Sequence, residues 1–382
     1  MDKVKCGIDV LKEEMDILQG LKLGLITNYT GVDRDLNSTV DILKESSELI
    51  CLFSPEHGVR GEFQAGAQVP DYIDRKTGVK VYSLYGDNRK PTKEMLKDID
   101  VLVFDIQDVG ARYYTYIYTM AYAMESAAEL GKRFIVLDRP NPLGGIKLEG
   151  NILDTEFSSF VGMYPIPVRY GLTIGELAKL FNTEFNIGCD LKVMELEGWS
   201  RDMYFEDTNL EFIAPSPNIP TVDTALLYIG TCLFEGTNVS EGRGTTKPFE
   251  LIGAPWMDGD KLAYELNSMN MEGVIFRPHY FTPVFSKYKG ELCEGIQIHV
   301  RDRDAIEAFK IGISIIHNLV SNYEEFKFLE PSSSGGHPFF DLLSGTNKLR
   351  EAIIADAVDD YLCSCEEELR EFEKIRQKYI MY

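Results

Sequence analysis

The first 140 residues alternate between short apolar runs and longer segments with helical periodicity. Four short, largely apolar runs occur, at residues 21–26, 49–53, 101–104 and 134–137. Runs of this length are typical of strands buried on both faces of a parallel sheet. Residues 9–19, ahead of the first run, and residues 113–130, between the last two runs, carry apolar positions at helical spacing. This order predicts an α/β fold with a Rossmann-like, doubly wound and mostly parallel sheet.

The pattern changes in the last third of the chain. Before it, we expect a short strand at 79–84, helices at 92–96 and 173–181, and a helix or strand at 225–233. After it, the expected elements are helices at 258–268, 304–320 and 347–378 and strands at 273–276 and 295–300. Because 382 residues exceed what one core usually fills, we expect two domains. Residues 1–245 would form the Rossmann-like domain with the crevice, and residues 246–382 a smaller α+β domain completing the cleft.

Polar side chains follow each of the four predicted strands. Asn28, Glu56, Asp105 and Asp138 stand just beyond the apolar runs. The carboxyl ends of parallel strands meet at one edge of the sheet, where open α/β folds place their ligand crevice. An isolated glutamate on a loop is usually only solvated, but four polar strand ends favour a shared binding crevice.

A glycine-rich segment, residues 235–246, carries two glutamates and an arginine. Its glycines allow the backbone to approach a ligand closely, and Glu235, Glu241 and Arg243 offer acid, base and anion partners. A flexible linker is the alternative interpretation. We expect this loop to close over the carboxyl edge of the sheet.

The charge of the chain limits its partners. The formal net charge is −22, which argues against nucleic acid and against anionic membrane surfaces. An anionic substrate would therefore require local arginines. We expect a monomer or a homodimer.

No motif for a nucleotide or a metal is present. The first strand runs into Thr27-Asn28 rather than a Gly-x-Gly-x-x-Gly turn, and no Walker sequence occurs. The five histidines, at positions 57, 279, 299, 317 and 337, show neither His-x-His nor i, i+4 spacing. We expect no cofactor and no metal site.

Cysteine use and the N-terminus indicate a cytoplasmic protein. The seven cysteines are odd in number and lack Cys-x-x-Cys pairs, which is typical of reduced thiols. No apolar signal segment precedes the first charged residues. No run approaches the ~18 apolar residues that span a bilayer.

Six sequence words carry a resemblance to a known family. They are LITN at 25–28, SPEHG at 54–58, DIQDVGAR at 105–112, DRPNP at 138–142, PSPN at 215–218 and EGTNVSEGRGT at 235–245. Together they resemble a bacterial family first described as a domain of unknown function, whose characterised members are exo-β-N-acetylmuramidases. The resemblance implies a Rossmann-like domain, a smaller second domain and a cleft between them. It also implies release of N-acetylmuramic acid from the non-reducing end of peptidoglycan fragments, with Glu56 at the centre of the cleft.

The chemistry of glycosidic cleavage assigns roles to these residues. It requires an acid for the leaving oxygen and a nucleophile, a base-activated water or the substrate's acetamido group. We expect Glu56 as the acid and Glu241 as the second group, with Asp105 and Asp108 as rivals. Arg243 is the first choice for the lactyl carboxylate of the sugar, ahead of Arg60, Arg112 and Arg139. The expected substrate-binding residues are Asn28, His57, Arg60, Asp105, Gln107, Arg112, Asp138, Arg139, Asn141, Asn218, Asn238 and Arg243.

Two alternatives and one departure from the family remain. A carbohydrate esterase or deacetylase would use Ser54 or Ser240 as nucleophile, although no Gly-x-Ser-x-Gly elbow is present. A non-catalytic sugar-binding protein would not require several converging carboxylates. Tyr170 stands where relatives are expected to carry histidine. An intracellular role on imported disaccharide is the interpretation that fits the chain without a signal segment.

Overall fold

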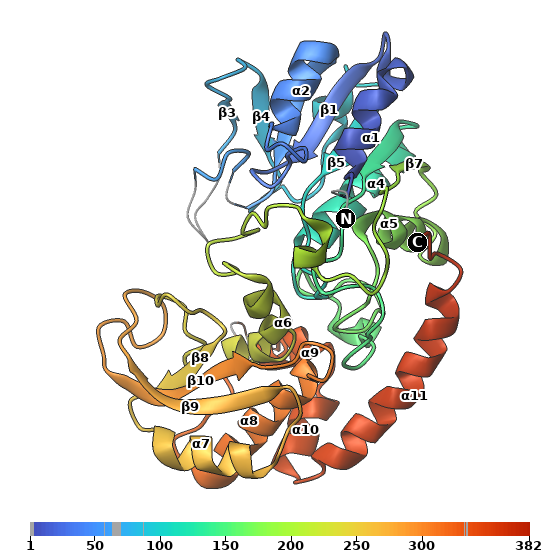
Figure 1. Ribbon diagram of the computed structural model, residues 1–382. Helices are drawn as coiled ribbons and strands as arrows, with labels where there is room; N and C mark the ends of the chain where they lie inside the picture. The colour runs from blue at the N-terminus through green and yellow to red at the C-terminus, as the bar shows by residue number, and fades with distance from the viewer. Residues whose placement is uncertain (1–3, 57, 63–69, 87, 332, 334) are drawn as a thin grey trace.

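The computed structural model describes residues 4–56, 58–62, 70–86, 88–331, 333 and 335–382. Two lobes lie one above the other (Figure 1). The helices of the first lobe are α1 (Gly7–Glu13), α2 (Thr39–Ser46), α3 (Lys93–Leu96), α4 (Tyr116–Glu129) and α5 (Ile174–Glu184). Its strands are β1 (Lys22–Thr27), β2 (Glu48–Ser54), β3 (Tyr72–Ile73), β4 (Lys80–Ser83), β5 (Val101–Asp105), β6 (Arg133–Leu137) and β7 (Asp190–Met194).

These strands form one seven-stranded sheet in the order β3-β4-β2-β1-β5-β6-β7. All neighbouring pairs are parallel except β3 with β4. The order reverses between β1 and β5, where Thr27 pairs with Asp105 in register. The predicted doubly wound fold is thus confirmed, and the four polar strand ends do lie on the same edge.

The two faces of the sheet are covered by different helices. Leu25, Leu52 and Val103 point to one face, where they pack with residues of α1 and α2. Their chain neighbours, such as Phe53 and Phe104, point to the other face and pack with α4 and α5. Because both faces are buried, the strands require the uninterrupted apolar runs seen in the sequence.

The second lobe is built on a three-stranded antiparallel sheet in the order β8-β10-β9. Its strands are β8 (Leu251–Ala254), β9 (Val274–Phe281) and β10 (Cys293–Val300). Its helices are α6 (Val222–Thr231), α7 (Gly259–Ser268), α8 (Ala308–Asn322), α9 (Phe339–Ser344), α10 (Lys348–Ile354) and α11 (Val358–Arg376). Short 3-10 helices include η1 (Met15–Leu18), η2 (Thr155–Phe157), η3 (Phe205–Thr208) and η4 (Cys232–Gly236). Strand β8, like β3 and β7 of the first sheet, was not predicted.

One predicted helix, over residues 347–378, is wrong. The structure divides it into α10 and α11, because Asp356 adopts a left-handed backbone with φ of 55°. Residues 9–19 likewise form α1 followed by η1 rather than one helix.

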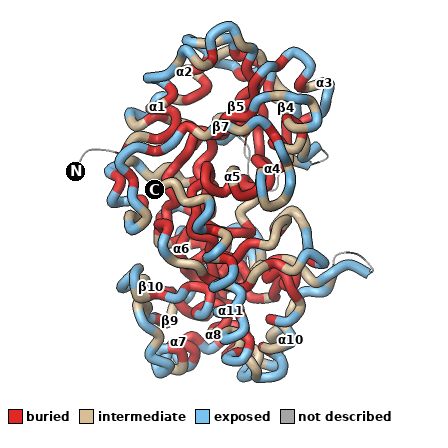
Figure 2. Tube along the Cα trace, turned by 90° about the vertical axis from the view of Figure 1, so that its right-hand side faces the viewer, coloured by how far each residue is buried: buried red, intermediate tan, exposed pale blue. Residues whose placement is uncertain are grey.

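Helix α6 lies at the junction of the lobes (Figure 1). Gly230 of α6 and Gly312 of α8 bring the two backbones together, because a Cβ at Gly230 would lie 2.1 Å from the Ala308 carbonyl oxygen. Buried apolar residues of α6 and α8 form one cluster, and this cluster includes Val109 and Tyr113 of the first lobe. Figure 2 shows buried segments continuing from one lobe into the other through this region. The domain boundary at residue 245 stays a prediction.

Helix α11 returns the chain from the second lobe to the first (Figure 1). Beyond it, the Tyr382 hydroxyl donates to Oδ2 of buried Asp138 at 2.7 Å. The backbone N–H of Leu196 donates to the same hydroxyl at 2.8 Å, and the Trp199 ring meets the Tyr382 ring edge to face. Within the described residues, none of the helices is long and apolar enough to cross a membrane.

Replacing Tyr382 with phenylalanine is expected to lower the free energy of unfolding by about 1 to 3 kcal/mol, because a buried carboxyl loses a hydrogen-bond donor. Urea unfolding followed by circular dichroism measures this change. Tyr379→Phe is the matched control, since the Tyr379 hydroxyl donates at 2.7 Å to Glu184, a partly exposed carboxylate. Its effect should stay below about 1 kcal/mol. Equal losses in both variants would contradict a special role for the Tyr382 contact.

Candidate functional site

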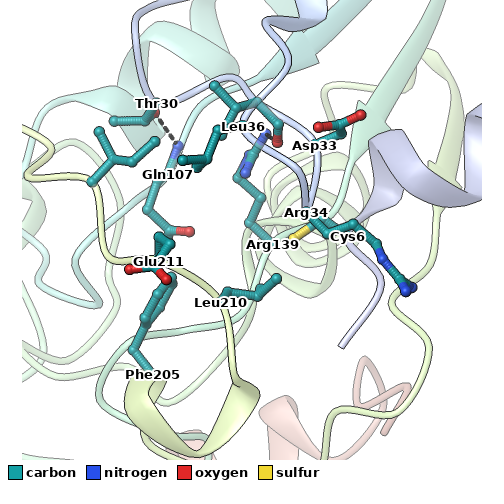
Figure 3. A pocket seen from close by; sticks show the side chains of 12 residues that line it. Cys6, Thr30, Asp33, Arg34, Leu36, Gln107, Arg139, Phe205, Leu210 and Glu211 are labelled. Atoms are coloured by element: carbon teal, nitrogen blue, oxygen red, sulfur yellow. Dashed lines mark hydrogen bonds between the residues drawn. The ribbon is translucent and has the colours of Figure 1, made fainter. Parts of the chain in front are cut away.

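The crevice expected between β1 and β5 is almost closed. A cavity of about 20 Å³ remains there, which is room for roughly one water molecule. Figure 3 shows the Arg139 side chain extending through it. Arg139 Nε donates to Oδ1 of Asp105 at 2.6 Å, and Nη2 donates to Oδ2 at 2.9 Å. Thr39 donates to the same carboxylate, so Asp105 and Arg139 neutralise each other inside the protein.

Other strand-end residues are also engaged within the fold. Oδ1 of Asp138 accepts from the backbone N–H of Gly175 at 2.7 Å, in the first turn of α5. The Asn141 amide donates to the Leu172 carbonyl oxygen at 2.8 Å. Gln107 and Asn28 are 5% and 2% exposed. These side chains position loops at the sheet edge rather than line a large cavity.

Two predicted arginines are held by contacts within the fold. Arg112 is fully buried, and its guanidinium donates to four backbone carbonyl oxygens, those of Asn151, Ile166, Leu343 and Ser344. Arg60 forms ion pairs with Asp41 and Asp74 at 3.1 and 2.8 Å. His57 lies outside the described residues.

A larger cavity, of about 160 Å³, receives residues from both lobes. The first lobe contributes Glu56, Tyr114 and Tyr116, the first residue of α4. The second lobe contributes Glu235 and Arg243. The other residues lining it are Tyr113, Thr115, Val161, Ser216, Asn218, Tyr228, Cys232, Phe339 and Leu343. Of the predicted site residues, this inter-lobe cavity therefore brings together Glu56, Asn218 and Arg243.

Glu56 is presented by the turn after β2. Ser54 ends the strand, and Pro55 cannot continue the ladder because it has no N–H. Burial, followed by the neighbouring Glu56 carboxyl, raises the pKa of Tyr85 to about 12. The Tyr116 hydroxyl donates to the Pro215 carbonyl oxygen at 3.0 Å and so fixes the opposite wall. Glu56 is half-buried and faces a wall rich in tyrosine.

The glycine-rich loop supplies the charged wall of the inter-lobe cavity. Arg243 Nη2 donates to Oε1 of Glu235 at 3.0 Å, and Nε lies 3.6 Å from Oε1 of Glu241. Gly242 and Gly244 flank the arginine with φ of 78° and 81°, a conformation that favours glycine. Glu241 is only 2% exposed and its Oε2 accepts from Lys287 at 2.9 Å.

Glu235, and not Glu241, lines the cavity. The sequence had shown both glutamates in one motif, and nothing in their spacing distinguished the cavity-facing one. Asn238 also turns away, because its amide donates to the Glu325 carbonyl oxygen at 2.8 Å and its Oδ1 accepts from the N–H of Lys327 at 2.8 Å. These contacts hold the loop against the second lobe.

Comparison with known families covers nearly the whole chain. Residues 23–223 match the model of the N-terminal part of the exo-β-N-acetylmuramidase NamZ, and residues 226–382 match that of its C-terminal part. The chain belongs to the NamZ family of exo-β-N-acetylmuramidases. The two family models meet between residues 223 and 226, ahead of the boundary predicted at residue 245.

Relatives of the NamZ family align along the full length. The peptidoglycan β-N-acetylmuramidase NamZ of Bacillus subtilis is 54% identical over 385 residues, covering 100% of this chain and 92% of that protein. A DUF1343 family crystal structure from Bacteroides fragilis superposes with a TM-score of 0.90 at 42% identity, covering 100% of this chain and 99% of that one. A second DUF1343 family crystal structure from the same organism superposes with a TM-score of 0.80 at 33% identity, with the same coverage of both chains.

Tyr170, where the NamZ family was expected to carry histidine, is buried against Asp108. Its hydroxyl donates to Oδ2 of Asp108. Burial raises the pKa of Asp108 to about 6, although the hydrogen bond from Tyr170 opposes this shift. Asp108 does not line the inter-lobe cavity, so this pair supports the loop behind the site.

We expect activity to survive a chelator. Across the residues that the structure describes, no group of three or more His, Cys, Asp or Glu side chains is arranged to hold a metal ion. Carboxyl groups alone can cleave a glycosidic bond. The measurement is release of free sugar with and without excess EDTA. Loss of activity that a single added metal restores would contradict this expectation.

Proposed function

We propose that this protein is an exo-acting β-N-acetylmuramidase that releases N-acetylmuramic acid from the non-reducing end of peptidoglycan-derived saccharides. The observation that carries the proposal is the inter-lobe cavity, in which the two family motifs containing Glu56 and Glu235 face each other. The 54% identical relative is itself named a peptidoglycan β-N-acetylmuramidase. Full-length similarity on both lobes supports transfer of that activity.

The test uses a disaccharide with N-acetylmuramic acid at its non-reducing end. Incubation with the protein should release free N-acetylmuramic acid, detected by mass spectrometry. The disaccharide with the two sugars in the opposite order should stay intact, because its muramic residue occupies the reducing end. Cleavage of both orders at equal rates would refute exo-acting muramidase activity.

We propose Glu56 and Glu235 as the catalytic carboxyls. Both line the inter-lobe cavity, one from each lobe, as required of groups that flank a scissile bond. Glu241 is less suited to this role than the sequence indicated, because its oxygens face Lys287 and Arg243 below the cavity surface. Asn218 is proposed to contact the sugar from the same cavity.

We propose that Arg243 binds the lactyl carboxylate. It is partly exposed and lines the cavity, whereas Arg60, Arg112 and Arg139 are engaged elsewhere. Arg243→Ala should narrow the preference for a muramic substrate over the matching N-acetylglucosaminide by roughly 1.5 to 3 kcal/mol, because only the muramic sugar carries the lactyl group. The measurement is kcat/KM on both substrates.

The control for that variant is Arg303→Ala. Arg303 is paired with Glu206 and Asp223, each at 2.8 Å, and does not line the inter-lobe cavity. Its removal should leave the preference unchanged. Equal losses on both substrates in Arg243→Ala would assign the carboxylate to another group.

An esterase or deacetylase is less well supported. The Ser54 hydroxyl donates to the Pro55 carbonyl oxygen at 2.9 Å, and the Ser240 hydroxyl oxygen accepts from the Gly242 N–H at 3.2 Å. Neither serine lines the inter-lobe cavity. A sugar-binding protein without catalysis would bind the disaccharide and release no free sugar in the assay above.

We propose a cytoplasmic role in recycling of imported saccharides. Seven cysteines without disulfides, six of them buried, support a reducing compartment. Cell fractionation tests this location, and light scattering decides between monomer and homodimer.

A further inference from the structure

Arg243 lies between the carboxylates of Glu235 and Glu241, which differ in their exposure to the cavity. Glu241 is 2% exposed, whereas the side chains of Glu235 and Arg243 are 22% and 24% exposed and face the cavity. The guanidinium also lies over the Phe249 ring, 5.0 Å from its centroid. Arg243 can therefore exchange the partner on its cavity side while it stays against Glu241 and Phe249.

Lys287 contacts the Glu241 carboxylate independently of Arg243. Its Nζ donates to Glu241 Oε2 at 2.9 Å and to the carbonyl oxygens of Phe234 and Val239 at 2.7 and 3.0 Å. Among the described residues, these ion pairs join a cluster of two carboxylates, Glu235 and Glu241, and two cations, Arg243 and Lys287. Its formal charge is zero when all four are ionised.

The remaining groups that face Glu235 are neutral or lie across the cavity. Burial raises the pKa values of Tyr228 and Cys232 well above their ordinary range, so both carry a proton at neutral pH. Glu56 is the carboxyl that lines the cavity from the other lobe. Glu235 is therefore the group of the cluster that can respond when another anion arrives.

A lactyl carboxylate on Arg243 would leave the cluster with one surplus negative charge in a partly buried site. A surplus charge in such a site raises the free energy of the complex unless it is paired or neutralised. A nearby anion raises the pKa of a carboxyl, and so does the loss of an arginine partner. Burial already raises the pKa of Glu235, with Arg243 as the main opposing influence. Proton uptake by Glu235 would restore a neutral cluster.

We propose, on the basis of the muramidase function above, that the substrate's lactyl carboxylate displaces Glu235 from Arg243 and thereby makes Glu235 the protonated acid of the reaction. The proton on Glu235 passes to the glycosidic oxygen as the C1–O bond breaks, and the leaving sugar departs as an alcohol. Water supplies the hydroxyl at C1, and its remaining proton returns to the carboxyls of the site. Glu56 then acts as the carboxylate partner rather than as the acid expected from the sequence.

This coupling makes the muramic sugar a requirement for turnover as well as for binding. An N-acetylglucosaminide lacks the lactyl group, so the Glu235–Arg243 ion pair stays closed and Glu235 stays ionised. Discrimination should then appear in kcat in addition to KM.

Proton uptake on binding tests the proposal directly. Binding of N-acetylmuramic acid to the full-length protein is measured by titration calorimetry in buffers of different ionisation enthalpy at several pH values. We expect uptake that approaches one proton per bound sugar, whereas N-acetylglucosamine should bind without uptake. Because the protonated form binds the anion, the association constant for N-acetylmuramic acid should fall as pH rises, by at most ~tenfold per pH unit.

Glu235→Gln separates Glu235 from the other carboxyls. This variant is neutral at position 235, so it should bind N-acetylmuramic acid at least as tightly as the wild type, without proton uptake and independently of pH. Glu206→Gln is the control, because Glu206 pairs with Arg303 outside the cavity, and it should behave as the wild type.

Three outcomes would overturn the inference. They are no binding of N-acetylmuramic acid, binding by the wild type without proton uptake, and uptake that persists in Glu235→Gln. Cleavage of the muramic disaccharide by the wild type is measured alongside. Absence of cleavage refutes the proposed function, whereas cleavage without linked proton uptake refutes the coupling alone.

Discussion

Replacing Glu56 with glutamine is expected to lower kcat for the muramic disaccharide by at least ~10²-fold while KM changes little. Glutamine keeps the shape of the side chain and its contact with the tyrosine-rich wall. It removes the charge and the proton-transfer capacity that the reaction requires from one of two flanking carboxyls. Steady-state kinetics on the disaccharide measures both parameters.

The control for this variant lies on the strand that precedes Glu56. Glu48→Gln changes the exposed first residue of β2, at the opposite end from Glu56, and should leave kcat unchanged. Glu56→Gln should also leave the ratio of muramic to glucosamine activity alone, since the lactyl group is bound by Arg243 in this proposal. A fully active Glu56→Gln enzyme would remove Glu56 from the mechanism.

Replacing Arg112 with methionine is expected to lower the free energy of unfolding by at least about 3 kcal/mol. The change leaves four buried carbonyl oxygens without their donors, and each unsatisfied group costs about 1 to 3 kcal/mol. Leu343 and Ser344 belong to the end of α9 and Ile166 to the first lobe, so the loss falls on the contact between lobes. Urea unfolding measures it.

Two further variants serve as controls for Arg112→Met. Arg133→Met removes an arginine that is 48% exposed and paired with Asp190, and should change stability by less than about 1 kcal/mol. Arg112→Lys retains the charge with fewer donors and should fall between the wild type and Arg112→Met. A stable Arg112→Met protein would show that water replaces the guanidinium.

The sequence predicted the interior strands of the first lobe well because their signal is local. Strands buried on both faces must be apolar throughout, so the runs ending at Phe53 and Phe104 could be recognised from composition alone. Strand β8 has only four residues, too few to carry a periodicity. The break at Asp356 depends on a left-handed backbone in a non-glycine residue, for which the sequence offered no turn signal.

The candidate site was predicted only in part, because pairing between charged side chains is decided in the folded chain. The polar strand ends do meet at one edge, yet Asp105 and Arg139 pair with each other there. Sequence position shows which residues reach an edge, but not which of them neutralise one another. The choice between Glu235 and Glu241 likewise depends on Lys287, which lies 46 residues beyond Glu241 and approaches only in the folded chain.

The position of the last residues bears on how the chain folds during synthesis. The first and last described residues share one small apolar cluster, in which Val4 packs with Trp199 and Tyr382. Asp138 belongs to the lobe that emerges first from the ribosome. Its carboxyl gains the hydrogen bond from the Tyr382 hydroxyl only after Tyr382 has been synthesised. The first lobe therefore cannot complete its packing as an independent unit. We expect the two lobes to fold in a single cooperative transition, once the segment that carries Tyr382 has been synthesised.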